Sequence, residues 1–216
     1  MRNPGGSAPL TRDEVARGQR ERILRATGEL VVKRGYHRTT VEMIVRKARV
    51  GYATFYKNFS GKEECFLTYL DQVATDAIMR IGEAAAVKAP WPEQVAAGLR
   101  TLFELAVEDP VAARVLLVES LTAGPKAVLR YEMALRGIAP IIRPGRRFNP
   151  DKAELPETLE DTLVGGVLWI LYQRLIVGES DRLPDVLPET LEFVLAPYIG
   201  EEEAVRVAGD IAVRTT

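Results

Sequence analysis

The chain contains few of the residues from which disulfide-bonded, metal-binding and many catalytic sites are built. Its 216 residues include one cysteine, Cys65, and one histidine, His37. A single cysteine excludes an intrachain disulfide and suits a reducing compartment, so we expect a cytoplasmic protein in which Cys65 is a packing residue. Neither a Cys/His cluster with zinc-ligand spacing nor a Gly-rich phosphate loop is present. We therefore predict that the chain is not an enzyme and holds no metal and no cofactor.

Long apolar runs are also missing. The nearest candidate, residues 163–177, is too short to span a bilayer and is interrupted by Gln173 and Arg174. Residues 1–15 have no apolar signal-peptide core, and their Gly and Pro content predicts a flexible tail. The sequence thus predicts neither a membrane span nor a secretory signal.

The net charge is only −1, but acidic residues are few in the first part of the chain and basic residues are outnumbered in the rest. Residues 1–62 contain 14 Lys and Arg against 5 Asp and Glu, a balance of +9, whereas residues 63–216 have a balance of −10. This asymmetry indicates two modules with different partners, because phosphates attract the first and an acidic remainder adds no nonspecific affinity for them.

Hydrophobic periodicity indicates helices throughout, and no segment alternates as a strand would. Ile23, Ala26 and Leu30 recur on one face of a first helix, two short helices follow, and Pro or Gly punctuates the later ones. We predict an all-α chain of about nine to ten helices. The predicted parts are a tail at 1–15, a three-helix DNA-binding domain at 16–62, a connecting fourth helix at 63–84 and a C-terminal helical domain at 85–216.

The segment VGYATFYKNFSGKEE, residues 50–64, divides its aromatic side chains between two faces of a short helix. Phe55 and Phe59 are four residues apart and are expected in the core, whereas Tyr52 and Tyr56 are expected on the outside. Two short helices joined by about three residues in a basic region are typical of a helix-turn-helix, whose second helix enters the major groove of DNA.

Side-chain caps mark the starts of the second and fourth helices. Thr39 with Glu42 has the spacing of a capping box at the second helix, and Thr40 is the alternative cap. Ser60 with Glu63 has the same spacing at the fourth.

Residues 17–68 resemble the TetR-type transcriptional regulators. The most specific part, TFYKNFSGK at residues 54–62, is similar to the family signature T-(L/F)-Y-x-x-F-x-x-K. The resemblance implies that Thr40, Tyr56 and Lys62 contact backbone phosphates. It also implies that Tyr52, Ala53 and Lys57 read or flank the bases. The complete set of predicted DNA-binding residues is Arg38, Thr40, Arg49, Gly51, Tyr52, Ala53, Thr54, Tyr56, Lys57, Asn58 and Lys62.

Two residues of the turn depart from the family pattern. Arg49 stands where the family usually has glycine, at a position where a positive φ strains any residue with a Cβ. Either the turn is built differently, or Arg49 accepts the strain and adds a phosphate contact. Gly51 replaces the usual serine cap of the recognition helix, which is a tolerable substitution.

For the C-terminal domain, the resemblance implies ligand binding and dimerisation. The apolar helices at about 157–177 and 188–198 are predicted to form a four-helix interface between two chains, through residues such as Leu168, Leu171 and Leu191. The alternative is that these helices are intrachain core. A pocket for an unknown lipophilic molecule is predicted at Phe103, Val107, Val115, Val118, Tyr131, Trp169 and Tyr172, with plain core packing as the alternative. Arg146 and Arg147 are expected to be solvated in a loop.

Together these patterns predict a homodimeric, sequence-specific DNA-binding transcriptional regulator. In the favoured form it is a repressor that a small lipophilic ligand releases from a palindromic operator on double-stranded DNA. The alternatives are a regulator controlled by a protein partner instead of a ligand, and an activator. An enzyme with a DNA-binding head is disfavoured, because the C-terminal domain shows no convergent titratable groups.

Overall fold

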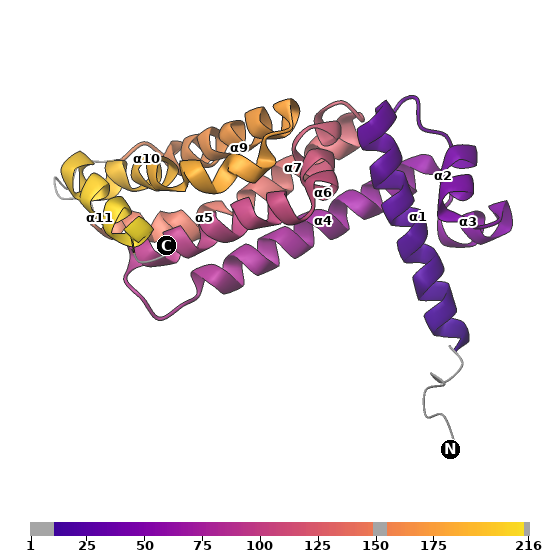
Figure 1. The fold of residues 1–216 in the computed structure, drawn as a ribbon, viewed down its shortest axis with the longest axis horizontal. Helices are drawn as coiled ribbons and strands as arrows, with labels where there is room; N and C mark the ends of the chain where they lie inside the picture. Colours follow the sequence, from indigo (N-terminus) through magenta and orange to yellow (C-terminus); the bar gives the residue numbers. More distant parts are fainter. Residues whose placement is uncertain (1–10, 149–154, 214–216) are drawn as a thin grey trace, which may run out of the picture. The chain divides into compact units, whose positions relative to one another are not determined.

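The computed structural model describes residues 11–148 and 155–213, and all regular elements within them are helices (Figure 1). The all-α prediction is confirmed. The chain forms two compact units, residues 1–69 and 70–216. The boundary lies inside α4 (Lys62–Ala85), close to the predicted connecting helix at 63–84, so one continuous helix begins in the first unit and ends in the second.

The first unit contains α1 (Arg12–Arg34), α2 (Val41–Ala48), α3 (Tyr52–Asn58) and the start of α4. Helix α1 begins within the segment that the sequence assigned to a flexible tail, because Thr11 and Glu14 form a capping box. The Thr11 hydroxyl accepts from the Glu14 amide at 3.2 Å, and the Glu14 carboxylate accepts from the Thr11 amide at 2.7 Å. The predicted limit of the tail at residue 15 was therefore wrong for residues 12–15.

Two further helix starts are now defined. Thr40, the alternative cap, begins α2 and accepts from the Met43 amide at 3.3 Å, whereas Thr39 is buried and donates to the Gly35 carbonyl. The predicted pairing of Ser60 with Glu63 is wrong. Because the first residue of α4 is Lys62, Glu64 is the third helical residue, and its carboxylate accepts from both the amide and the hydroxyl of Ser60 at 2.6 Å.

The core of the first unit holds α3 on α1 and α2. Phe55 and Phe59 are 0% and 2% exposed with ring centroids 5.8 Å apart. Gly28 of α1 faces Tyr69 so closely that a Cβ would lie 2.3 Å from the ring. Cys65 is fully buried beside the Thr27 hydroxyl at 3.2 Å, and burial raises the pKa of its thiol to about 11. Close packing fixes the orientation of the short α3.

The second unit is a helical bundle in which proline occupies the first turn of several helices, as helix starts favour. No helix in the described parts of the chain combines the length and the apolar character that a bilayer crossing needs. After α4, the elements are α5 (Trp91–Glu108), α6 (Pro110–Leu117), η1 (Glu119–Leu121), α7 (Pro125–Arg136), α8 (Ala139–Ile142), η2 (Arg143–Phe148), α9 (Leu159–Val177), η3 (Ser180–Val186), α10 (Leu187–Ile199) and α11 (Glu201–Val213).

Arg146 is not a solvated loop residue, as the sequence suggested, but part of a polar cluster in the second unit. Its guanidinium donates to both carboxylate oxygens of buried Glu160, at 2.7 and 2.8 Å, and the Tyr198 hydroxyl donates to the same carboxylate at 3.1 Å. The hydrogen bonds from Arg146 are the largest cause that lowers the pKa of Glu160. Such a two-point pair satisfies a carboxylate that burial would otherwise penalise.

Candidate nucleic-acid interface

The turn between α2 and α3 has the left-handed residue that the family pattern requires, but that residue is arginine. Arg49 has φ 54° and ψ 51°, and among the described non-glycine residues it alone has a positive φ. Its amide donates to the Arg46 carbonyl at 3.3 Å, and the Val50 amide donates to the Val45 carbonyl at 3.1 Å. This pattern closes the end of a helix. Of the two alternatives for the turn, Arg49 accepts the strain, and its side chain is exposed.

Helix α3 presents a polar face above its buried phenylalanines. Tyr52 and Tyr56 are 51% and 56% exposed, so the predicted division of the aromatics is confirmed. Ala53 and Lys57 are exposed beside them, and Thr54 is half-buried. Two phenol groups, a lysine and a small alanine on one face can approach DNA closely and donate hydrogen bonds to phosphates or bases.

The residues around the start of α2 extend this surface. Thr40 is exposed at the helix N-terminus, where unpaired backbone amides favour an anion. Arg38 is exposed, and its Nε donates to the Arg34 carbonyl at 2.7 Å. Gly51 caps α3 from an extended conformation with no side-chain hydrogen bond. The predicted residues before and within α3 therefore lie on an accessible part of the first unit.

Asn58 and Lys62, also predicted to bind DNA, make internal contacts. The Asn58 side-chain amide donates to the Thr54 carbonyl at 2.8 Å. The Lys62 ammonium donates to the Tyr36 carbonyl at 2.9 Å and lies 4.3 Å from the centroid of the Tyr36 ring. Burial lowers the pKa of Lys62. These contacts fix the end of α3 and the start of α4, and a DNA contact by either side chain stays a prediction.

Arg46 is a basic residue that the sequence reasoning missed. It is exposed in the last turn of α2, three residues before Arg49. The signature that drew attention to the region lies in α3 and α4, so it gave no weight to the outer face of α2. The available signal was the spacing of the two arginines.

The predicted ligand-binding residues differ in exposure, and their role in ligand binding stays a prediction. Phe103 and Val115 are buried in the core, Val107 and Trp169 are 38% and 57% exposed, and the remaining three are half-buried. None of the seven lines the two pockets described next. Apolar character at helical spacing does not distinguish residues inside a helical bundle from residues on its surface, so this prediction could not separate the two.

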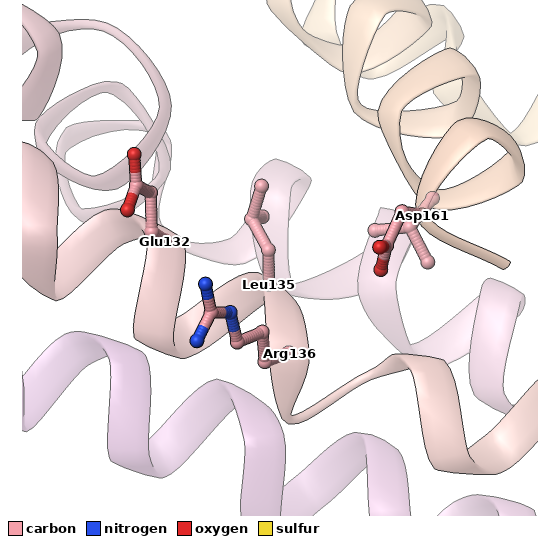
Figure 2. A pocket seen from close by; sticks show the side chains of 5 residues that line it. Glu132, Leu135, Arg136 and Asp161 are labelled. Carbon is pink, nitrogen blue, oxygen red and sulfur yellow. The ribbon is translucent and has the colours of Figure 1, made fainter. Parts of the chain in front are cut away.

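Two neighbouring pockets lie in the second unit. The larger, about 150 Å³, has Glu132 and Arg136 of α7 on one side and Asp161 of α9 on the other (Figure 2). The smaller, about 30 Å³, is wholly apolar and lies among α5, α8 and α9. Val164 lines both. The remaining lining residues are Leu135 in the larger pocket, and Leu99, Leu102, Ile138, Ile142, Val167 and Leu168 in the smaller.

Helices α9 and α10 each have an exposed apolar side, but not the side that the sequence suggested. Leu168, Leu171 and Leu191 lie in the chain's own core. Trp169 is exposed on α9 and stacks on Tyr172 with centroids 5.4 Å apart. The other large exposed apolar residues on these two helices are Ile176, Val177 and Phe193.

Comparison with known proteins supports the interpretation of the first unit. The family described as "Bacterial regulatory proteins, tetR family" matches residues 23–69. The HTH-type transcriptional activator FasR of Mycolicibacterium smegmatis is 26% identical over 125 residues, which are 58% of this chain and 55% of FasR. The HTH-type transcriptional regulator YhgD of Bacillus subtilis is 24% identical over 82% of this chain and 92% of its own length. The chain thus spans little more than half of FasR and nearly all of YhgD.

A solved structure extends the similarity of fold to both units. The transcriptional regulator FadR of Bacillus subtilis, solved in complex with stearoyl-CoA, has a TM-score of 0.71 and 20% identity, covering 82% of this chain and 98% of FadR. At that identity the match concerns the fold. The family model covers the helix-turn-helix, so residues 23–69 are a DNA-binding domain of the tetR-family type, and the similarity of the rest of the chain is one of fold.

Proposed function

We propose that the protein is a cytoplasmic homodimer that binds a palindromic operator and represses transcription until a small lipophilic ligand releases it. The observation that carries the proposal is the outer face of α3, where Tyr52, Tyr56 and Lys57 are exposed above a fixed phenylalanine base. A helix so presented after a tight turn has the geometry for entering a major groove.

Within this proposal, the contacts have two kinds. Thr40 at the start of α2, Tyr56 and Arg49 bind backbone phosphates and set the position of α3. Tyr52 and Ala53, with the methyl group of Thr54, face base edges and supply sequence preference. Because phosphate contacts dominate affinity and are salt-dependent, operator binding should weaken steeply as salt concentration rises.

The exposed side of α9 and α10 supports dimerisation. Trp169, Ile176 and Val177 on α9 and Phe193 on α10 are large apolar side chains that water would meet in a monomer. A second copy of the same two helices would cover them in a four-helix interface with two-fold symmetry. Two recognition helices related in this way read half-sites about one helical turn, roughly 34 Å, apart.

The two pockets support a ligand, and their small size indicates how it would act. Pockets that hold drug-sized molecules usually enclose about 300–1,000 Å³, more than the 150 and 30 Å³ present here. A lipophilic molecule that enters these two pockets past Val164 would therefore move α5, α8 or α9. Only the state with these helices apart would bind it well, which is the differential affinity that a ligand switch requires. The structural relative FadR holds stearoyl-CoA.

Selection of random duplex DNA on the purified protein tests the DNA-binding part. We expect an inverted repeat to be enriched. Tyr56→Phe and Lys57→Ala should both bind the enriched duplex more weakly, and Lys57→Ala, which removes a positive charge, should also show a shallower salt dependence. Lys88→Ala removes the same charge from an exposed position of the second unit and serves as the matched control. If the wild type selects no sequence, α3 does not read DNA.

Light scattering and titration test the rest. We expect light scattering to give the mass of a dimer. We also expect at least one compound of a lipophilic panel, including fatty acids and acyl-CoA, to raise the protein's thermal midpoint, and the same compound to abolish operator binding. If no compound changes operator affinity, the alternative of a protein partner gains support. A reporter gene behind the selected operator separates repression from activation, which matters because FasR is named as an activator.

A further inference from the structure

The first three turns of α1 contain no buried residue. Residues 11–17 are exposed, and the first buried residue of the helix is Ile23. Short helices without packing are marginal in water, and here the capping box at Thr11 and Glu14 holds the end. Figure 1 shows this half of α1 continuing past α2 and α3, its neighbours in the same unit.

One face of α1 packs on the core in the C-terminal half of the helix and carries arginines in the N-terminal half. Thr27 and Ile23 are buried on that side, and Arg20 lies seven residues, two helical turns, before Thr27. Arg17 follows one turn further toward the N-terminus and Arg12 two turns further. The face that is apolar where it meets the core thus carries Arg17 and Arg20 where it leaves the core, with Asp13 and Arg12 at the start of the helix.

Arg20 places this stripe beside α3. Its guanidinium lies 4.5 Å from the centroid of the Phe59 ring, and its Nη1 donates to the Asn58 carbonyl at 3.3 Å. Asn58 and Phe59 are the end of the helix that the proposed function places in the major groove. Arg17 and Arg12, which come next along α1, therefore border the duplex beyond that end.

Among the described residues, neither Arg12 nor Arg17 forms an ion pair, although Asp13 lies beside Arg12 and four residues before Arg17. The Glu14 carboxylate is engaged by Thr11, whose hydrogen bonds are the main cause that lowers the pKa of this acid. The cationic side chains stay available for an anionic partner.

Resting on the proposed function, we propose that the first three turns of α1 are a second DNA-contact surface, in which Arg12 and Arg17 bind backbone phosphates outside the base pairs that α3 reads. Arginine suits this task because its planar guanidinium donates two parallel hydrogen bonds to a phosphate. Such contacts add affinity without sequence preference. The surface thus gives the protein a longer footprint than the helix-turn-helix alone provides.

The test compares Arg17→Ala and the double variant Arg12→Ala/Arg17→Ala with the wild type, by fluorescence anisotropy on the selected operator across a KCl series. Each dimer loses two phosphate contacts per substitution, so we expect Arg17→Ala to bind roughly tenfold or more weakly and to lower the salt slope by about two. Arg25→Ala, an exposed arginine on the opposite side of α1, should change neither quantity. Arg17→Lys should retain most of the slope.

A duplex trimmed to the inverted repeat provides a second readout that does not depend on a variant's stability. On this short duplex, which lacks the flanking phosphates, the wild type and Arg17→Ala should have the same affinity. If Arg17→Ala matches the wild type on the long duplex at every salt concentration, the inference is wrong while the proposed function stands. If the wild type itself selects no sequence, the proposed function fails first.

Discussion

Replacing Arg49 separates two consequences of one residue, backbone strain and positive charge. Its left-handed conformation places a Cβ against the following carbonyl, whereas glycine adopts that conformation freely. Its guanidinium is exposed beside α3, where we expect it to bind a phosphate. Arg49→Gly removes both the strain and the charge, and Arg49→Ala removes the charge but keeps the Cβ.

The expected changes in the free energy of unfolding differ in magnitude between the two variants. Relief of left-handed strain is worth about 1–2 kcal/mol, and the greater freedom of glycine in the unfolded chain costs about 0.5–1 kcal/mol. Arg49→Gly should therefore be more stable than Arg49→Ala by about 1 kcal/mol, which in a chain of this size raises the thermal midpoint by roughly 2–4 °C. Both should bind operator DNA equally weakly, with the salt slope reduced by about two per dimer.

Urea unfolding followed by circular dichroism measures the first difference, and anisotropy on the selected operator measures the second. Arg49→Lys is the control, because it keeps the charge and the strain and should resemble the wild type in both assays. Equal stability of the glycine and alanine variants would refute the argument that this turn is strained. Unchanged operator affinity in both would show that Arg49 serves the turn alone.

Three further outcomes are expected elsewhere in the chain. Gly145→Ala should lower the free energy of unfolding in urea by about 2–3 kcal/mol, because the added Cβ would lie 2.4 Å from the Trp91 ring. Gly209→Ala is the control, because a Cβ there meets open space and should cost nothing. Equal effects of the two substitutions would contradict this packing. Cys65, whose pKa burial raises to about 11 from the usual 9.0, should react with a thiol reagent at pH 8 only after unfolding. Stability should accordingly fall as pH rises from about 9 to 11, since the unfolded chain loses that proton first. Trp169→Asp should yield a monomer in light scattering that binds operator poorly, and a stable dimer of this variant would exclude the proposed interface.

Local rules were sufficient to predict the DNA-facing helix. The division of Phe55 and Phe59 from Tyr52 and Tyr56 follows from the 3.6-residue period of a helix and from the cost of burying hydroxyl groups, and both act within a few residues. The left-handed turn at Arg49 was one of two alternatives, and it came from the resemblance to a family that usually has glycine at this position.

Tertiary contacts decided the features that the sequence could not predict. Nothing in the sequence near Arg146 shows that the carboxylate of Glu160, 14 residues away, will be buried against it. Helix α9 is apolar on nearly all sides, so its period does not show that Leu171 faces the core while Trp169 faces outward. The pockets pose the same difficulty, because their walls come from two or three helices and depend on how those helices pack.

In the proposed ligand response, α4 matters because one continuous helix belongs to both units. At its start, Lys62 is fixed to the Tyr36 carbonyl and Tyr69 packs on Gly28. In the second unit, Asp71 pairs with Arg130 of α7, and Ile78 packs against Gly137 at the end of α7, where an added Cβ would lie 3.0 Å from it.

An exposed ion pair contributes only about 0–1 kcal/mol, because water screens both charges, and Arg130 and Asp71 are each 41% exposed. Allosteric coupling usually amounts to about 1–3 kcal/mol. The close packing of Ile78 and of buried Ile81, which lies within contact distance of Gly98 on α5, is therefore the stronger link between α4 and the helices that line the pockets. A ligand that displaces α5 or α7 would move α4 through these isoleucines, and the ion pair would contribute little.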